Sequence, residues 1–544
     1  MSELLRGWLD QPHPGRGVHL ADDIGGWDHL GYAELASAAK RTATGLIADG
    51  VRPGDVVCVL MPTGFPCITG FFAVWAAGAA VCLIPPPAFV GEDDYVAHVG
   101  RILAQARPRL LVTSPELESF ARRALSEADL AQEPWLHRES ETEAELQPAG
   151  ELALVQFTSG SSGTPRGVRV TWANLAANIE LIRSWIDWRD GDQTASWLPL
   201  YHDMGLIGCL LTPVCGQGDL WLMRPVQFIR DPGRWLECFT FAQHTAAPPF
   251  AFDYLTRRVR PERLSTLDLS GWRSAIVGAE PIDPDALERF TELASPAGFS
   301  PTAYLPAYGL AEATLAVSAH TTDEAPPVIR PDSASLKFGE TVVVEQKRRL
   351  GDPTSDDEGG WLVGCGRATG VRILDEDGAV LDEGRLGEIE VHGPSVAVGY
   401  RGGHEHASTR FVDDAVRTGD AGFVHEGQLY VLGRMGDSLK VRGRSVYVED
   451  LEAKVSAATR MRRGRFAVVS TARSGIALFA EAADGGWIDD ASTVLRNELG
   501  PDVAISIVIG SSGLIRKTSS GKPKRRHMWE QFQAGALTGA RVAR

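Results

Sequence analysis

The chain has 544 residues, of which 44% are hydrophobic and 23% are charged, and its formal net charge is −16. This length is too great for one compact domain, so we expect two or more domains with ample core. The acidic balance argues against general nucleic-acid binding, because the phosphates would be repelled. No nucleic-acid partner is therefore expected.

Cysteine use and the N-terminal sequence both predict a cytoplasmic protein. The chain contains no CxxC pair, and the odd number and scattered spacing of its cysteines favour reduced, buried thiols and no zinc site. The first ten residues contain no signal-peptide hydrophobic region. The cysteines are Cys58, Cys67, Cys82, Cys209, Cys215, Cys238 and Cys365.

One apolar stretch, Cys67–Ile84, is long enough to suggest a membrane span. It contains two glycines and runs into Pro85-Pro86-Pro87. A helix over Cys67–Ala77 followed by a buried strand over Ala80–Ile84 explains the stretch better. We expect no membrane insertion.

Helical patterns alternate with short β-branched runs over the first 300 residues, which predicts parallel βαβ layers. The expected helices are Tyr32–Asp49, Pro66–Ala77 and Asp283–Leu293. The expected strands are Val56–Met61, Leu110–Thr113, Thr245–Ala247 and Ser274–Val277.

The pattern changes after about residue 360. Expected strands at Val371–Asp375, Gly387–His392 and Leu429–Leu432, joined by Gly/Asp turns, predict a smaller and more antiparallel unit. Residues 352–360 form a polar loop. From about residue 437 an α+β segment follows, with a helix at Val448–Ala457, strands at Phe466–Ser470 and Ile505–Ile509, and a basic tail.

The predicted fold class is α/β. A large N-terminal domain (1–433) combines layered α/β subdomains with a small β-rich subdomain (about 361–433). A small α+β C-terminal domain (434–544) follows it.

Residues 157–168, Phe-Thr-Ser-Gly-Ser-Ser-Gly-Thr-Pro-Arg-Gly-Val, follow the apolar run Leu152–Phe157. The glycines allow close backbone approach and positive φ. Hydroxyl groups and the fixed charge of Arg166 suit a polyanion such as a nucleoside triphosphate. A flexible linker is the alternative, and no Walker motif is present. The candidate phosphate-binding residues are Thr158, Ser159, Gly160, Ser161, Ser162, Gly163, Thr164 and Arg166.

Two further segments carry candidate ligand contacts. Val277-Gly278-Ala279-Glu280-Pro281 ends a buried strand in a small-residue turn, which is where α/β sheets bind ligands. In the segment 307–314, Glu312 lies among apolar and small residues. If buried it needs a partner such as Mg²⁺, and the alternative is a surface glutamate at a helix start.

Three polar positions have both a structural and a functional interpretation. His202, after the apolar run 197–201, is either a hydrogen-bonded structural histidine or a site residue. Asp420 lies in an expected turn, Arg417–Asp420, with an exposed carboxylate that would suit ribose hydroxyls. Lys522 lies in a Gly/Ser loop where it can meet a phosphate or carboxylate, or simply belongs to a solvated basic terminus.

These segments together resemble the adenylate-forming superfamily of acyl- and aryl-CoA synthetases, luciferases and non-ribosomal adenylation domains. The fatty acyl-AMP ligases are the most similar group. The resemblance covers nearly the whole chain, and the segment 337–362 is similar to the insertion that marks these ligases off from CoA synthetases. The matching segments are Phe157–Val168, Trp197–Gly205, Gly278–Pro281, Tyr308–Thr314, Thr418–Asp420, Gly433–Glu452 and Thr518–Arg525.

The resemblance implies ATP and Mg²⁺ as cofactors and attack of an acid on the α-phosphate, with positioning and charge neutralisation as the main contributions. The 158–167 loop would hold the β- and γ-phosphates, and Glu312 with Thr158 would hold Mg²⁺. Lys522 would bridge the attacking carboxylate and the phosphate from a mobile C-terminal domain, and His202 would line the acid pocket. Adenine and the adenylate would lie against Gly278, Ala279, Glu280, Tyr308 and Gly309, and ribose against Asp420 and Arg434.

Two positions depart from the family pattern. Gly436, in the hinge segment 433–437, stands where many relatives have lysine, and Arg166 replaces the usual lysine of the phosphate loop. Arginine keeps the charge but changes its geometry. We therefore expect pyrophosphate binding with altered kinetics.

The acceptor and the acid are less sharply predicted. The insertion favours a carrier-protein phosphopantetheine arm over free CoA, and a basic cluster could dock an acidic carrier, although a solvated turn is the alternative. That cluster is Arg460, Arg462, Arg463 and Arg465. The acid pocket is expected around 224–228 and 248–252, where Arg224, Gln227 and Pro249 suggest a shorter or functionalised acid.

Other functions stay open at this point. The chain could be a CoA synthetase for a small or aromatic acid, could activate an unusual or inorganic oxyacid, or could pass the adenylate to an amine. A nucleotide-binding regulatory protein is the non-enzymatic alternative, and the presence of Lys522 and Glu312 argues against it.

Overall fold

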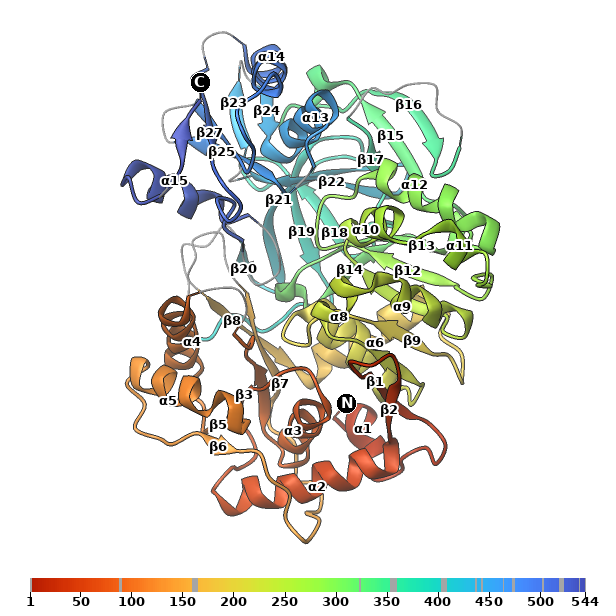
Figure 1. The fold of residues 1–544 in the computed structure, drawn as a ribbon, viewed down its shortest axis with the longest axis vertical. Coiled ribbons are helices and arrows are strands. Elements are labelled where there is room, and N and C mark those ends of the chain that lie inside the picture. The colour runs from red at the N-terminus through yellow and green to blue at the C-terminus, as the bar shows by residue number, and fades with distance from the viewer. Residues whose placement is uncertain are drawn as a thin grey trace.

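The structure is a computed structural model. It describes residues 2–87, 91–158, 165–321, 324–352, 360–402, 409–435, 438–441, 444–462, 464–471, 475–500, 503–517, 523–537 and 539–543. In Figure 1 the N-terminal helices lie at one end of the long axis and the C-terminal elements at the other.

A six-stranded sheet has the order β6-β5-β3-β4-β7-β8. Its strands are parallel except for β8, which forms an antiparallel hairpin with β7. The strands are β3 (Val56–Leu60), β4 (Ala80–Leu83), β5 (Leu110–Thr113), β6 (Trp135–Leu136), β7 (Leu152–Thr158) and β8 (Arg166–Thr171).

An eight-stranded sheet has the order β14-β13-β12-β11-β9-β10-β1-β2. Its six inner strands are parallel, and the two edge strands β14 and β2 are antiparallel to their neighbours. The strands are β1 (Gly17–Ala21), β2 (Trp27–Gly31), β9 (Thr194–Ser196), β10 (Leu220–Leu222), β11 (His244–Ala247), β12 (Ser274–Val277), β13 (Tyr304–Gly309) and β14 (Ala316–Ala319).

Helices separate and cover these two sheets. The helices are α1 (Ser2–Arg6), α2 (Tyr32–Ala48), α3 (Phe65–Ala76), α4 (Glu92–Ala106), α5 (Glu118–Glu127), α6 (Trp172–Trp185), α7 (Thr212–Cys215), α8 (Pro225–Arg230), α9 (Pro232–Glu237), α10 (Phe250–Arg258), α11 (Pro261–Leu264) and α12 (Pro284–Ala294). A π-helix, η3 (Met204–Leu211), precedes α7. Short 3₁₀ turns are η1 (Gly7–Leu9), η2 (Pro115–Leu117), η4 (Cys238–Thr240), η5 (Ser295–Ala297), η6 (Pro301–Ala303), η7 (Ala311–Ala313) and η8 (Ser333–Ser335).

The main core lies between the two sheets. Residues of α2, α3 and α6 pack there against β3 and β4 of one sheet and β1 and β10 of the other. Helix α3 is buried from Cys67 to Ala76, because it contacts protein on every side. This burial explains the apolar stretch, and within the described ranges no helix combines the length and apolarity needed to cross a membrane.

Two further cores complete the layers. Helices α4 and α5 cover the outer face of the six-stranded sheet. Helices α9, α10 and α12 cover the outer face of the eight-stranded sheet. The predicted α/β fold class is confirmed, and the predicted helices and strands agree with the observed ones to within two residues at each end.

The β-rich part follows the layered part. A three-stranded sheet holds β15 (Pro327–Pro331), β16 (Val344–Arg349) and β17 (Leu362–Val363). A five-stranded antiparallel sheet holds β18 (Val371–Leu374), β19 (Gly387–His392), β20 (Arg410–Val412), β21 (Ala415–His425) and β22 (Gln428–Arg434).

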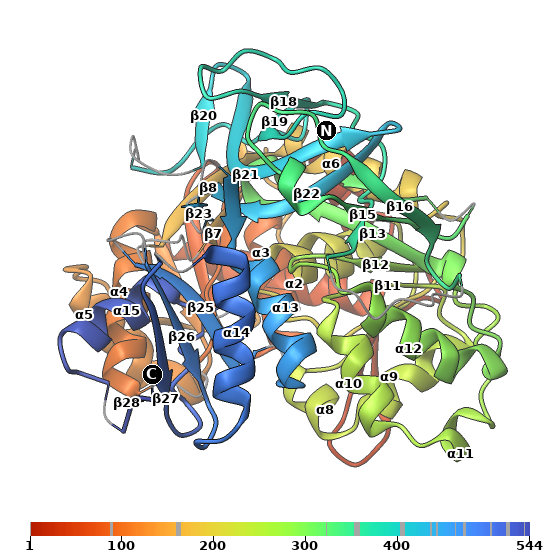
Figure 2. The same cartoon turned by 90° about the horizontal axis from the view of Figure 1, so that it is seen from above.

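The C-terminal part has its own core, built from α13, α14 and a four-stranded sheet. In Figure 2, α13 and α14 lie along one side of β25, β26 and β27. The predicted basic tail includes a helix, α15, which packs on β25 through Met528 and its neighbours. The elements are β23 (Ser438–Val441), β24 (Arg444–Tyr447), α13 (Val448–Thr459), β25 (Phe466–Thr471), β26 (Gly475–Ala480), α14 (Trp487–Leu499), β27 (Ile505–Ile509), α15 (Arg525–Gln533) and β28 (Arg541–Val542).

All seven cysteines are described, six of them are buried, and no disulfide joins any of them. This agrees with the prediction of reduced thiols.

The predicted domain boundary, between residues 433 and 434, falls in the last two residues of β22. The use of this boundary as a hinge stays a prediction.

Candidate active site

Asp420 joins two strands that are far apart in sequence. The Tyr308 hydroxyl donates a 2.5 Å hydrogen bond to Oδ2 of Asp420, and Nε of Arg434 lies 2.9 Å from Oδ1. Each carboxylate oxygen of Asp420 therefore has a side-chain partner.

The exposed turn predicted for Asp420 is wrong. Asp420 lies inside β21 and is 7% exposed, because β19 and β22 pair with β21 on its two sides. In the register of β21 and β22, Asp420 stands opposite Arg434, which places the carboxylate and the guanidinium side by side.

Burial raises the pKa of the Tyr308 phenol well above its usual value, and the negative charge of Asp420 raises it further. The phenol therefore keeps its proton at neutral pH and stays a donor. Arg434 is held in turn, since its Nη1 donates to Thr409 Oγ1 at 2.9 Å and to the Thr418 carbonyl at 2.5 Å.

Glu312 lies in η7, four residues after Tyr308, and is 4% exposed. The Tyr400 hydroxyl donates a 2.5 Å hydrogen bond to its Oε1. The surface alternative for Glu312 is therefore excluded. Arg166 completes the cluster, because its Nη1 lies 3.3 Å from the Tyr400 oxygen and its guanidinium carbon lies 5.1 Å from the ring centre.

Tyr400 was not predicted from the sequence. It lies 88 residues from Glu312, and no pattern of glycines or hydroxyl residues around it points to a ligand. Burial raises the pKa of its phenol, and the nearby negative charge of Glu312 raises it further. A protonated Tyr400 can therefore hold the Glu312 carboxylate in place.

Helix α6 positions the turn that carries Glu312. The side chain of Asn178, fully buried on α6, donates to the carbonyls of Ala313 and Ala316 and accepts from the Ala316 N–H at 3.0 Å. One turn earlier, Asn174 donates to the carbonyls of Pro394 and Val396 at 2.8 Å each. The helix thus fixes both backbone segments that bring Glu312 and Tyr400 together.

Thr158, the last residue of β7, stands opposite Arg166, the first residue of β8, in the register of the antiparallel pair. The Thr158 hydroxyl oxygen and Arg166 Nε are both buried, and neither has a hydrogen-bond partner among the described residues. These are polar atoms that a bound ligand could satisfy. Ser159, Gly160, Ser161, Ser162, Gly163 and Thr164 lie outside the described residues.

Two glycines permit close backbone approach beside Tyr308. A Cβ at Gly278 would lie 2.8 Å from the Ala307 carbonyl oxygen, and one at Gly309 would lie 2.0 Å from the Leu315 carbonyl oxygen. Ala279 follows at φ 68°, exposed at the end of β12, and Glu280 beside it is half-buried. The predicted adenine residues therefore lie at the carboxyl ends of β12 and β13, where parallel sheets bind ligands.

His202 lies two residues before the π-helix η3, with its Nδ1 2.7 Å from Asp203 Oδ1. Its role stays a prediction.

The structure removes the basis for inferring a shorter or functionalised acid from Arg224 and Gln227. The Gln227 amide is satisfied by the Ala21 and Asp22 carbonyls at 3.0 Å each, and Arg224 pairs with Asp23 at 2.6 Å. Neither side chain needs a polar acid as its partner.

Residues 11–401 match the AMP-binding enzyme family. The chain belongs to this family. It is 31% identical to the long-chain-fatty-acid–AMP ligase FadD32 of Mycolicibacterium smegmatis, over 93% of this chain and 89% of the relative. It is also 31% identical to the long-chain-fatty-acid–AMP ligase FadD26 of Mycobacterium tuberculosis, over 96% of this chain and 94% of the relative.

Solved structures give the same result. A structure from a study of fatty acyl-adenylate ligases of E. coli and L. pneumophila matches with a TM-score of 0.86 at 29% identity, over 98% of both chains. A fatty acyl-adenylate ligase from L. pneumophila in complex with acyl adenylate and pyrophosphate matches with a TM-score of 0.69 at 26% identity, over 98% of this chain and 96% of that chain. This member of the AMP-binding enzyme family is an adenylate-forming ligase of the acyl-AMP type.

Several predicted residues of this AMP-binding enzyme lie outside the described residues. They include Lys522, the hinge residues Gly436 and Asp437, and Arg463 of the basic cluster. Most of the predicted polar loop, residues 353–359, also lies outside them. Their roles stay predictions.

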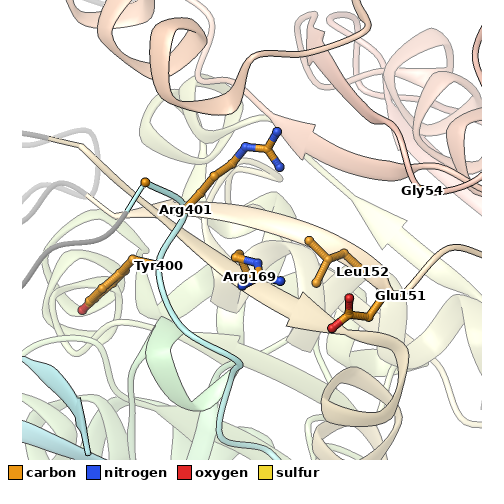
Figure 3. A pocket seen from close by; sticks show the side chains of 7 residues that line it. Gly54, Glu151, Leu152, Arg169, Tyr400 and Arg401 are labelled. Atoms are coloured by element: carbon orange, nitrogen blue, oxygen red, sulfur yellow. The ribbon is translucent and has the colours of Figure 1, made fainter.

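A separate cavity of about 500 Å³ opens beside β8 and the segment 400–402. Figure 3 shows Arg169, Arg401 and Glu151 around it, while the Tyr400 side chain points away from the guanidinium of Arg401. Apart from Tyr400 it contains no residue of the clusters described above. The cavity is therefore not the predicted nucleotide site of this AMP-binding enzyme.

Proposed function

We propose that the protein activates a carboxylic acid with ATP. A carboxylate oxygen attacks the α-phosphorus, the bond from that phosphorus to the bridging oxygen breaks, and acyl-adenylate and pyrophosphate form. The observation that carries the proposal is that one short segment, 308–312, holds both side-chain clusters. Tyr308 contacts Asp420 and Arg434, and Glu312 contacts Tyr400.

Each cluster suits one part of the nucleotide. Asp420 is an acceptor for ribose hydroxyls, oriented by Tyr308 and Arg434. Gly278, Ala279, Glu280 and Gly309 frame the base at the strand ends. Thr158, Arg166 and the loop between them bind the β- and γ-phosphates, with arginine matching phosphate geometry.

The buried Thr158 hydroxyl without a described partner and the buried Glu312 carboxylate fit Mg²⁺, which prefers hard oxygen ligands. Arg166, opposite Thr158, reaches Glu312 through Tyr400, so the two candidate ligands belong to one cluster. A bound Mg²⁺ would neutralise phosphate charge. Tyr400 keeps the Glu312 carboxylate oriented, and Arg166 adds a fixed positive charge.

The favoured acid is a fatty acid. The similar ligases are named for long-chain fatty acids or fatty acyl groups. Trp197 stacks on Phe228 at 4.1 Å between ring centres and packs edge-on to Phe250 at 5.7 Å, so an apolar surface joins the two predicted pocket segments. His202 is proposed to line the same pocket.

The favoured acceptor is the phosphopantetheine thiol of an acidic carrier protein. Arg460, Arg462 and Arg465 are exposed on the C-terminal part, which gives a basic surface in an acidic chain. The segment similar to the ligase insertion is fixed on α12, because Arg348 of β16 pairs with Glu288 and lies 4.7 Å above the Trp361 ring. A fixed insertion favours a carrier over free CoA.

Lys522 is proposed as the catalytic lysine of a mobile C-terminal domain, residues 434–544, that works with the large domain 1–433 in the cytoplasm. Its ammonium group would meet the attacking carboxylate and the α-phosphate as a point charge. Lys522→Ala should abolish adenylate formation and leave the large domain folded.

The test uses the full chain with Mg·ATP and a panel of fatty, aryl, amino and inorganic acids. Adenylate is detected by mass spectrometry and pyrophosphate by a coupled assay, with CoA or a loaded carrier added in parallel. Fatty acyl-adenylate and transfer to the carrier are expected. Adenylate of another acid, or transfer only to CoA or an amine, would overturn that part of the proposal. Pyrophosphate release by Lys522→Ala at the wild-type rate would remove its catalytic role.

A further inference from the structure

Three metal-ligand side chains gather on the eight-stranded sheet, in residues that the proposed function does not use. His19 lies in β1, His29 in β2, and Asp219 directly before β10. One ligand atom from each lies within 4.8 Å of the other two. Figure 1 shows β1 and β2 side by side near the N mark.

The strand register explains why the three residues meet. His19 stands directly opposite His29 in the antiparallel β1–β2 pair, so the two side chains lie on one face. Strand β10 is the other neighbour of β1, with Val18 opposite Leu220, which brings Asp219 to the same place. Three adjacent strands thus contribute one ligand each.

Contacts around the cluster limit its motion. The His19 ring stacks on Trp221 at 3.8 Å between ring centres with an interplanar angle of 4°. Asp219 Oδ1 accepts a 2.9 Å hydrogen bond from the Gly17 N–H and lies 3.3 Å from His19 Nε2. His29 is exposed, so a metal ion can enter from solvent and keep water as a further ligand.

We propose that His19, His29 and Asp219 form a binding site for a divalent transition metal, with Zn²⁺ as the first ion to test. Two imidazoles and one carboxylate suit Zn²⁺, Co²⁺ or Ni²⁺, whereas Mg²⁺ prefers oxygen ligands. Metal entry replaces the His19–Asp219 hydrogen bond by two coordinate bonds. Arg16, which pairs with Asp190 at 2.7 Å, is the nearby cation that opposes binding.

The site is a stabilising clamp and not part of the active site. Asp219 precedes β10, whereas Gly278 follows β12, and β10, β9, β11 and β12 run parallel. Asp219 therefore lies at the amino ends of these parallel strands, whereas the proposed adenine residues lie at their carboxyl ends. A bound ion would tie the edge strand β2 to β1 and to the chain before β10.

The test measures Zn²⁺ binding to the full, metal-free chain by competition with a chromogenic chelator, without ATP or Mg²⁺. Unfolding temperature and the visible absorption of Co²⁺ are recorded in parallel. His29→Ala changes an exposed ligand on an edge strand, so it tests the site without touching the core, and Asp219→Asn tests the carboxylate. His527→Ala, exposed on α15, is the matched control.

We expect one tight Zn²⁺ per wild-type chain at this site and a rise in unfolding temperature on binding. His29→Ala should weaken Zn²⁺ binding at least about tenfold, because removing even a residue that only hydrogen-bonds to a metal ligand weakens metal binding by about that factor. His527→Ala should leave the affinity unchanged. The sequence also holds a close pair, His404 and His406, so a double His404→Ala/His406→Ala variant is included. Equal affinity in the wild type and His29→Ala, or binding lost only in the double variant, would overturn the proposal.

Discussion

The Tyr308 hydroxyl donates a 2.5 Å hydrogen bond to Oδ2 of Asp420, across 112 residues of sequence. This contact ties the end of β13 in the layered domain to β21 in the β-rich sheet. The same carboxylate receives Arg434 on its other oxygen. The proposed ribose site therefore depends on how the two sheets pack against each other. Removing the Tyr308 hydroxyl tests whether this contact contributes to ATP binding.

Tyr308→Phe removes the hydroxyl and keeps the ring. We expect the KM for ATP to rise about tenfold, because a hydrogen bond to a charged group contributes about 1.5–3 kcal/mol. Asp420 keeps Arg434, so the protein should stay folded, although the loss of this buried hydrogen bond should lower its unfolding temperature. Tyr254→Phe is the matched control, since it removes a 2.7 Å hydrogen bond to the Ile229 carbonyl outside the proposed site. An unchanged KM in Tyr308→Phe would contradict the assignment of the ribose site.

Glu312→Gln keeps the shape of the side chain, and its amide oxygen can still accept from Tyr400. The loss is one negative charge, so we expect kcat/KM for Mg·ATP to fall about 10²–10³-fold, as for other electrostatic contributions. The Mg²⁺ concentration for half-maximal rate should rise. Glu237→Gln on α9 is the control. Activity that stays at the wild-type level across a magnesium titration would count against the role.

Asn178→Ala leaves buried backbone groups of the Glu312 turn without partners, namely the carbonyls of Ala313 and Ala316 and the Ala316 N–H. We expect the free energy of unfolding to fall by about 3 kcal/mol, since each unsatisfied buried group costs about 1–3 kcal/mol. Urea unfolding measures this change. Asn497→Ala, exposed on α14, is the control. Equal losses in both variants would show that the buried amide has no special role.

Arg348→Ala removes a side chain that is 8% exposed, pairs with Glu288 and lies over Trp361. Breaking a buried ion pair costs about 3–5 kcal/mol, so β16 should loosen from α12. If this segment keeps CoA away from the adenylate, acyl-CoA should become detectable by mass spectrometry while adenylate formation continues. Lys347→Ala, on the same strand with an exposed partner in Glu426, is the control. Absence of acyl-CoA in Arg348→Ala would contradict the prediction.

Local patterns predicted the fold well. The strands Leu110–Thr113, Ser274–Val277, Gly387–His392 and Ile505–Ile509 have the expected bounds, because each is a short β-branched run that lies inside a sheet. The expected turn at Asp420 failed for a tertiary reason. Gly419 and Asp420 read as a turn locally, but strand pairing on both sides of β21 overrides that preference.

The site was predicted only where its residues lie in contiguous motifs. Tyr400 and Asn178 were missed because their partners are 88 and 135 residues away and nothing local distinguishes them. The proposed metal ligands His19, His29 and Asp219 were likewise not singled out in the sequence, because Asp219 lies 200 residues from His19. Arg224 and Gln227 misled, because their partners on residues 21–23 are invisible in the local sequence.

The buried thiols make the fold sensitive to alkali. Burial raises the pKa of Cys67, Cys238 and Cys365 to about 12 and that of Cys209 to about 11. In the unfolded chain these thiols ionise near pH 8.5. A pKa raised by folding contributes stability that is complete below the unfolded pKa and is lost as pH rises toward the folded value. Each thiol should lower the free energy of unfolding by about 1.4 kcal/mol per pH unit across that window.

Urea unfolding from pH 7 to 10.5 with a reducing agent measures this loss. Cys365→Ala should show a slope that is shallower by about 1.4 kcal/mol per pH unit above pH 9, because one titrating thiol is gone. Below pH 8 the two proteins should change in parallel, which serves as the internal control. Identical alkaline slopes in the wild type and Cys365→Ala would mean that Cys365 does not stay protonated in the folded protein.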